Sequence, residues 1–144
     1  MKRKTIILTL VAVVLLMQLI RIDRKPPVFD EKKDILISTE APENIHRILK
    51  RSCYDCHSYE TKYPWYSAVA PVSWMLKLHV NEGREHLNFS NWQDYSPNVQ
   101  NGYKTLSIKE IKNNKMPLIS YTLIHSEAKL TDQTKKELMS WFEQ

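Results

Sequence analysis

The chain has 144 residues, with 21 basic and 16 acidic side chains and a formal net charge of +5. Residues 1–25 hold six of the basic side chains and one of the acidic ones, so the rest of the chain is balanced. A domain that binds nucleic acid carries a basic patch, so this N-terminal excess gives no reason to expect nucleic acid as a partner. Only two glycines occur, and alternating strand patterns are scarce. We therefore expect one domain of helices joined by loops.

The N-terminal segment is predicted to insert into a membrane. Basic residues at positions 2–4 precede an uncharged, mainly apolar run over residues 5–20. No small-residue cleavage site follows, so we expect an anchor that is retained rather than a signal peptide that is removed. The run is short for the about 17–25 residues that span a bilayer, but Arg21 and Arg24 can snorkel to the interface. We assign residues 1–22 to a single-pass transmembrane helix.

A change of composition separates this anchor from the rest of the chain. Residues 23–34 contain Pro26, Pro27 and several charged side chains, a composition typical of a loop. We expect this stretch to be a tether, and residues 35–144 to form the helical domain.

The domain is predicted to begin with a helix over residues 42–52. Pro42 suits the first turn of a helix, and Ile45, Ile48 and Leu49 repeat at the spacing of one apolar face. This helix ends directly before the most informative motif of the chain.

Residues 53–57 form a C-x-x-C-H motif, the pattern at which haem is covalently attached in c-type haem proteins. Cys53 and Cys56 are three residues apart, so on one turn of helix their thiols face the same side and can each add to a vinyl group of one porphyrin edge. His57 follows directly, where its ring can become the proximal iron ligand. The sequence therefore predicts one covalent haem c, with its iron, as the cofactor.

Three other interpretations of the cysteines fit less well. A thioredoxin-like redox pair should follow a strand, and nothing near residue 53 alternates like one. A structural zinc site needs four ligands, and only distant histidines could complete it. A plain disulfide would leave His57 without a role.

An aromatic stretch follows the motif and leads into a helix predicted over residues 71–85. Tyr63 and Trp65 are suited to shielding a porphyrin face or bonding a propionate, and Arg84 could pair with a propionate through two parallel bonds. The alternative is that the aromatic side chains belong to the core and that Arg84 is solvated.

Two more helices are expected before the chain ends. One is predicted to open at Ser107, where Ser107 and Glu110 form a capping box. The last is predicted to open at Thr131 and to carry apolar and aromatic side chains to the terminus.

Met116 is the favoured sixth iron ligand. It lies in a loop between predicted helices, and Pro117 holds it in extended conformation, which frees its thioether. Met75 and Met139 fall at helical positions, where methionine is more often part of the core.

His79 is the alternative sixth ligand. On the predicted helix it shares one face with Met75 and His86. His46 and His125 are expected at the surface.

The order of a helix, a C-x-x-C-H motif, a Met-Pro loop and a terminal aromatic helix resembles that of class I c-type cytochromes. Longer strings resemble more closely the haem-binding domain family of small membrane-anchored cytochrome c-like proteins, over roughly residues 30–142. These strings are Tyr63-Pro64-Trp65-Tyr66, Ala70-Pro71-Val72-Ser73-Trp74, His79-Val80-Asn81-Glu82-Gly83-Arg84, Leu87-Asn88-Phe89-Ser90 and Met116-Pro117. The resemblance implies an all-α, cytochrome c-like fold around one haem held by Cys53 and Cys56, with His57 as proximal ligand.

These features together predict an electron carrier rather than an enzyme. Haem is attached to such motifs outside the bacterial inner membrane, so we expect an inner-membrane protein with its haem domain on the periplasmic side. Its partners would be the membrane and redox proteins, with no small-molecule substrate. The alternative is a peroxidase-like enzyme or a gas or redox sensor, which needs a labile sixth site and a polar group such as His79 or Arg84. A role in haem handling beside an oxidase is a third hypothesis.

Overall fold

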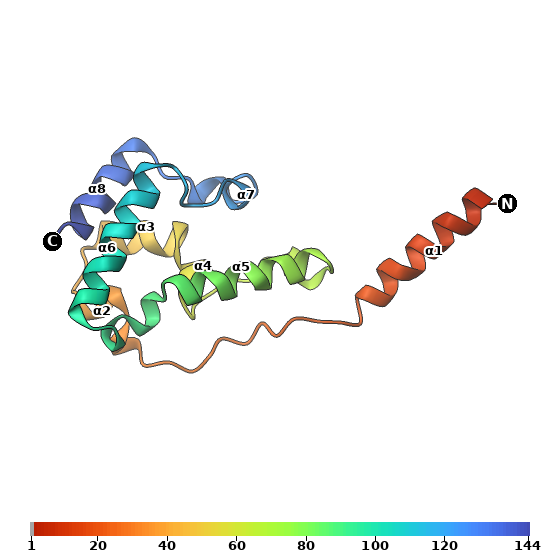
Figure 1. The fold of residues 1–144 in the computed structure, drawn as a ribbon, viewed down its shortest axis with the longest axis horizontal. Coiled ribbons are helices and arrows are strands. Elements are labelled where there is room, and N and C mark those ends of the chain that lie inside the picture. Colours follow the sequence, from red (N-terminus) through yellow and green to blue (C-terminus); the bar gives the residue numbers. More distant parts are fainter. Residues whose placement is uncertain (1) are drawn as a thin grey trace.

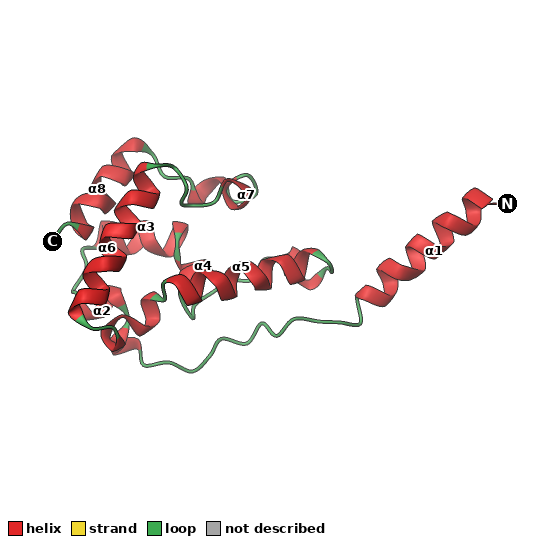
Figure 2. Ribbon diagram, in the orientation of Figure 1, coloured by secondary structure: helices red, strands yellow, loops and turns green. Residues whose placement is uncertain are grey.

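The computed structural model describes residues 2–144, and all regular structure in that range is helical (Figure 2). The α-helices are α1 (Lys2–Met17), α2 (Ile35–Ser38), α3 (Glu43–Ser52), α4 (Tyr54–His57), α5 (Val72–His86), α6 (Pro97–Lys112), α7 (Ile119–Thr122) and α8 (Asp132–Phe142). The 3-10 turns are η1 (Glu31–Lys33), η2 (Trp65–Ala68), η3 (Phe89–Asp94) and η4 (Ser126–Ala128). The prediction of an all-α domain is confirmed.

The helices form one packed body from which α5 projects, with α1 standing apart beyond the far end of α5 (Figure 1). In the body, α6 packs against α8, α3 contacts both α4 and α8, and α2 lies on η3. The link between this body and the projection is the contact between α4 and α5.

The apolar side chains of helix α1 are exposed to solvent. Its nine leucine, isoleucine and valine side chains are between 47% and 69% exposed, and its 16 residues rise by about 24 Å at 1.5 Å per residue. Within residues 2–144 no helix is long and apolar enough to cross a membrane. The predicted transmembrane helix is therefore not supported by the structure.

Three of the predicted helices are confirmed to within a residue. Helix α3 follows Pro42, α5 follows Pro71, and α8 follows Thr131, which is its N-cap. Thr131 exchanges bonds with Thr134 in a capping box, which satisfies amide groups that the first turn leaves free.

The prediction that a helix begins at Ser107 is wrong. Helix α6 begins ten residues earlier at Pro97, after the N-cap Ser96. A proline in the first turn is itself a start signal, because its ring fixes a helical φ and no amide is lost. Ser107 and Glu110 have capping-box spacing but lie inside the helix.

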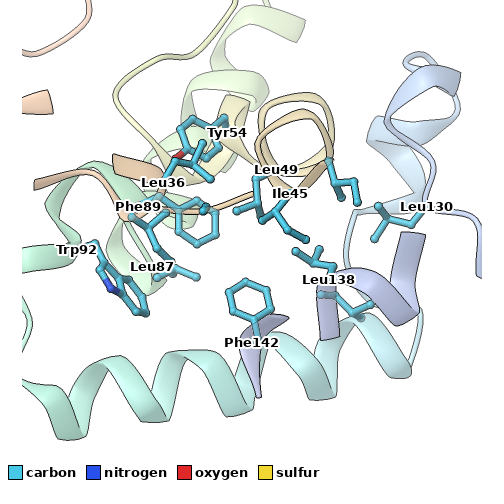
Figure 3. Packing of buried hydrophobic residues seen from close by; sticks show 14 residues of the cluster. Leu36, Ile45, Leu49, Tyr54, Leu87, Phe89, Trp92, Leu130, Leu138 and Phe142 are labelled. Atoms are coloured by element: carbon cyan, nitrogen blue, oxygen red, sulfur yellow. The ribbon is translucent and has the colours of Figure 1, made fainter. Parts of the chain in front are cut away.

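The core is formed by α2, α3, η3, α6 and α8 and includes the second residue of the C-x-x-C-H motif (Figure 3). Tyr54 is 1% exposed, and its ring stacks on Phe89 at 5.5 Å. Its hydroxyl donates to Oδ1 of Asp34 at 2.6 Å, and the same oxygen accepts from the amide of Leu36 at the start of α2. Burial raises the pKa of Asp34, and the bond from Tyr54 opposes that rise. The motif is thus fixed to the core through Tyr54.

Gly83 sets how closely α5 approaches the motif. A Cβ at this position would lie 2.6 Å from the carbonyl oxygen of Cys56. Glycine inside a helix costs about 0.5–1 kcal/mol relative to alanine. Here that cost is offset by direct packing of the α5 backbone on the motif.

Replacement of the two glycines by alanine should have opposite effects. Gly83→Ala should lower the free energy of unfolding by about 1–3 kcal/mol, because α5 and the motif must separate. Gly102 lies in α6 with open space around the position of a Cβ, so Gly102→Ala should raise stability by about 0.4–1 kcal/mol. Urea unfolding followed by circular dichroism measures both changes. Equal effects of the two substitutions would contradict the close approach at Gly83.

Candidate functional site

A cavity of about 640 Å³ opens between the packed body and α5. This volume is typical of sites for small molecules and cofactors. Its apolar wall is formed largely by Leu49, Leu87, Phe89, Ile111, Leu130 and Phe142. Its polar groups include Asp55, His57, His79, Glu82, His86 and Glu110.

Cys53, Cys56 and His57 all line this cavity. The amide groups of Cys56 and His57 both donate to the carbonyl oxygen of Cys53, at 3.2 and 3.0 Å, so the motif is one turn of helix. Both thiols are free. Burial raises the pKa of Cys53 to about 12 and that of Cys56 to about 11. They therefore lack the lowered pKa that activates the nucleophilic cysteine of a redox pair.

His57 is oriented by the end of α5. Its Nδ1–H donates to the carbonyl oxygen of Leu87 at 3.0 Å, so Nε2 carries the lone pair that can bind a metal. Burial lowers the pKa of His57, which favours the neutral ring that a ligand requires. Leu87 is the C-cap of α5, and its amide bonds to the carbonyl oxygen of Gly83 at 2.9 Å.

Met116 and His79 both line the cavity, whereas Met17, Met75 and Met139 do not. The backbone of Met116 is held by its amide, which donates to the carbonyl oxygen of Glu110 at 3.3 Å. Met75 is 60% exposed on α5, and Met139 packs against the core. His46 and His125 do not line the cavity.

His79, Glu82 and His86 form a polar row along the side of α5 that lines the cavity. Their spacing of three and four residues keeps them on one face of the helix. Within residues 2–144, no group of three or more His, Cys, Asp and Glu side chains is arranged to hold a metal ion. The zinc site considered as an alternative is therefore not found there.

Asp55, the third residue of the motif, holds α7 beside the cavity. Its Oδ2 accepts from the hydroxyl of Tyr121 at 2.6 Å, and its Oδ1 accepts from the amide of Lys62 at 2.9 Å. The ring of Tyr121 stacks on His125 at 4.5 Å, and Nε2 of His125 lies 2.7 Å from the hydroxyl of Tyr66. Burial and the carboxylate together raise the pKa of Tyr121. The contact gave no local signal in the sequence, because Asp55 and Tyr121 are far apart in the chain.

Arg84 braces the turn that follows the motif. Its Nε donates to the carbonyl oxygen of Ser58 at 2.8 Å, and Nη2 donates to the hydroxyl of Thr61 at 3.0 Å. The guanidinium also lies over the ring of Tyr59, 5.2 Å from its centroid. This side chain therefore already makes protein contacts that the sequence did not indicate.

Tyr63, Trp65 and Arg84 do not line the cavity. Trp65 is 82% exposed, and Tyr63 is partly buried. Contact of these side chains with a cofactor stays a prediction.

The donor set suits haem. Two thiols on one helical turn, an adjacent imidazole with a free Nε2 and a large, mainly apolar cavity meet the needs of a covalently held porphyrin and its iron. Met116, in the loop after α6, and His79, on α5, offer a thioether and a second imidazole to the same cavity.

Comparison with known proteins agrees with this donor set. Residues 12–144 match a protein family described as the haem-binding domain. No curated protein and no solved structure gives a match. The matched range covers most of the chain, including the whole cavity, and the family supports haem with its iron as the cofactor. The chain therefore belongs to the haem-binding domain family.

Proposed function

We propose that this protein carries one haem c, attached to Cys53 and Cys56, and that it is a membrane-tethered electron carrier. The observation that carries this proposal is the grouping of both thiols and His57 on one turn of the cavity wall, with Nδ1 of His57 held by Leu87. When bound, haem supplies one-electron chemistry through its iron. The protein has to hold the iron ligands rigidly and keep water away.

Residues of the cavity wall can both hold the iron ligands and exclude water. His57 is the proximal ligand, and its bond to Leu87 keeps Nε2 free and the ring fixed. Met116 is the sixth ligand, with His79 as the alternative, because both line the cavity. The apolar wall around Leu49, Phe89 and Phe142 excludes water from the site. A filled sixth position with no substrate site is typical of electron transfer.

The second candidate function is a peroxidase-like enzyme or a gas or redox sensor. The polar row of His79, Glu82 and His86 on the cavity wall favours it. Such a protein needs an open or weakly held sixth position with polar groups beside it. The two candidates therefore differ in how firmly the sixth ligand is bound.

The tether in this proposal is the apolar segment that begins with α1. Its exposed leucine, isoleucine and valine side chains have no partner in the domain, and the apolar run continues past the helix to Ile20. Lipid would cover this surface, with basic residues at both ends of the segment near the headgroups. The haem domain would then lie on the periplasmic side of the inner membrane, where redox proteins are its partners.

Haem should be bound covalently through both thiols. Extraction of the purified protein with acidified acetone should leave the haem on the polypeptide, and the pyridine haemochrome should be of the c type. A Cys53→Ser/Cys56→Ser double variant should release its haem into the organic layer under the same conditions. Release from the wild-type protein would refute covalent attachment.

The axial pair decides between the two functions. Met116→Ala should abolish the weak long-wavelength charge-transfer band of a methionine-ligated ferric haem, lower the reduction potential, and open the iron to cyanide and carbon monoxide. His79→Ala should leave the band intact. Met75→Ala is the matched control, since Met75 is 60% exposed and outside the cavity.

Two other spectral outcomes would contradict Met116 as a firmly bound sixth ligand. A silent Met116→Ala together with a spin-state change in His79→Ala would assign the sixth position to His79. Rapid binding of carbon monoxide by the unmodified protein would favour the enzyme or sensor.

Tyr121 should keep the Met116 segment closed over the site. Tyr121→Phe removes the bond to the Asp55 carboxylate, and loss of a hydrogen bond to a charged group costs about 1.5–3 kcal/mol. Cyanide should therefore bind the ferric protein ~10-fold to 100-fold faster, as measured by stopped-flow absorption. Tyr103→Phe is the control, because Tyr103 also lines the cavity but its hydroxyl makes no hydrogen bond to any residue in 2–144. Equal rates in both variants would rule out a closing role for Tyr121.

A further inference from the structure

The residues that follow α1 are bound to the projecting end of the domain. The side-chain amide of Gln18 makes two hydrogen bonds with the backbone of Ala70, just before α5. The amide of Ala70 donates to Oε1, and Nε2 donates to the carbonyl oxygen of Ala70, both at 3.0 Å. Nε2 also donates to the carbonyl oxygen of Val14 inside α1 at 2.8 Å. One side chain thus joins the anchor helix to the haem domain.

The chain then continues along α5. Nε1 of Trp74 donates to the carbonyl oxygen of Ile20 at 3.0 Å, and Nζ of Lys77 donates to the carbonyl oxygen of Asp23 at 3.0 Å. Trp74 and Lys77 are three residues apart, so they share one face of the helix. Residues 20–23, from the end of the predicted anchor to the start of the predicted tether, therefore lie against α5. Figure 1 shows the extended segment leaving α1 and running past α5.

Apolar side chains are exposed at the same end of the domain. Trp65 in η2 is 82% exposed, and Val69 and Val72 are each 43% exposed. We call these three residues the η2 face. They flank Ala70, to which the last turn of the anchor segment is bonded, so the η2 face and the end of α1 are held together.

The contact at Ala70 determines what can cover the η2 face. Gln18 touches Ala70 directly, so no free length of chain separates the apolar segment from the domain. If the apolar segment lies in a bilayer, its end at Ile20 lies at the interface, and the η2 face must lie there too. Tryptophan is enriched at that depth, where its ring suits the headgroup region. The exposed Arg21 and Arg24 add positive charge beside anionic headgroups.

We propose that the η2 face rests on the headgroup region of the bilayer that holds α1, and that this contact fixes the orientation of the haem domain. The proposal rests on the membrane tethering in the proposed function. Helix α5 then runs from the lipid contact to the motif, since Gly83 touches Cys56 about 16 Å along the helix from Val72. The cavity keeps a constant position relative to the membrane instead of swinging on a flexible linker.

Lipid photolabelling of the full-length holoprotein tests this orientation. The protein is reconstituted into vesicles of phosphatidylcholine and phosphatidylglycerol that contain a lipid with a photoreactive diazirine near its headgroup, and labelled residues are mapped by mass spectrometry. We expect label in α1 and on the η2 face. Ile37 in α2 is the control for an exposed apolar side chain elsewhere, because it is 54% exposed and should stay unlabelled.

A variant that breaks the junction makes the test specific. Gln18→Ala with Trp74→Phe removes the three hydrogen bonds that tie residues 18–20 to Ala70 and to α5. Label on the η2 face should fall severalfold while label in α1 is unchanged. Gln133→Ala is the control, since Gln133 is exposed on α8 and bonds only to Glu137.

The outcomes separate this proposal from the tethering on which it rests. Label in α1 without label on the η2 face would overturn the orientation and leave the tether intact. Absence of label from α1 as well would overturn the tether itself. Equal label on Ile37 and the η2 face would show nonspecific reaction with exposed apolar side chains and would also overturn the orientation.

Discussion

The contact between Gly83 and Cys56 is the constraint on which the site depends. With no side chain at position 83, the backbone of α5 reaches the carbonyl oxygen of Cys56. Two further features of the same helix end then act on the motif and the turn after it. Arg84 bonds to Ser58 directly after it, and Leu87 accepts the Nδ1–H of His57. The direction in which His57 presents Nε2 is therefore set by α5 and not by the motif alone.

The two variable residues of the C-x-x-C-H motif fix its other sides. Tyr54 is buried in the core and donates to Oδ1 of Asp34, and loss of its hydroxyl would leave that buried oxygen with the amide of Leu36 as its donor. Asp55 points to α7 and accepts from Tyr121. One helical turn thus faces the core, α5, α7 and the cavity through different residues, which leaves it little freedom to rotate. In the proposed function, a ligand turn held in this way would need little reorganisation when the haem iron gains or loses an electron.

Local signals predicted much of this arrangement, and contacts between distant segments account for the rest. The motif, α3 and α8 follow from spacing, periodicity and caps that lie within a few residues of each other. The start of α6 was missed because Ser107 and Glu110 have capping-box spacing inside a helix. Leu87 acts through its carbonyl group, which every residue has, so no sequence pattern marks it. Gly83 was detectable, because it is one of two glycines and lies inside a predicted helix.

A chain of contacts also joins η2 to the motif, the two regions on which the proposed function and orientation depend. Tyr66 lies in η2 beside the exposed Trp65, and its hydroxyl forms a hydrogen bond with Nε2 of His125. His125 stacks on Tyr121, which donates to Asp55 in the motif. The turn proposed to lie on lipid is therefore linked to α7, whose Tyr121 lines the cavity. Because each contact in this path restrains the next, fixing η2 on a surface would also restrain α7. In the proposed function, an orientation set by the membrane would therefore favour the closed cavity that a firmly bound sixth ligand requires.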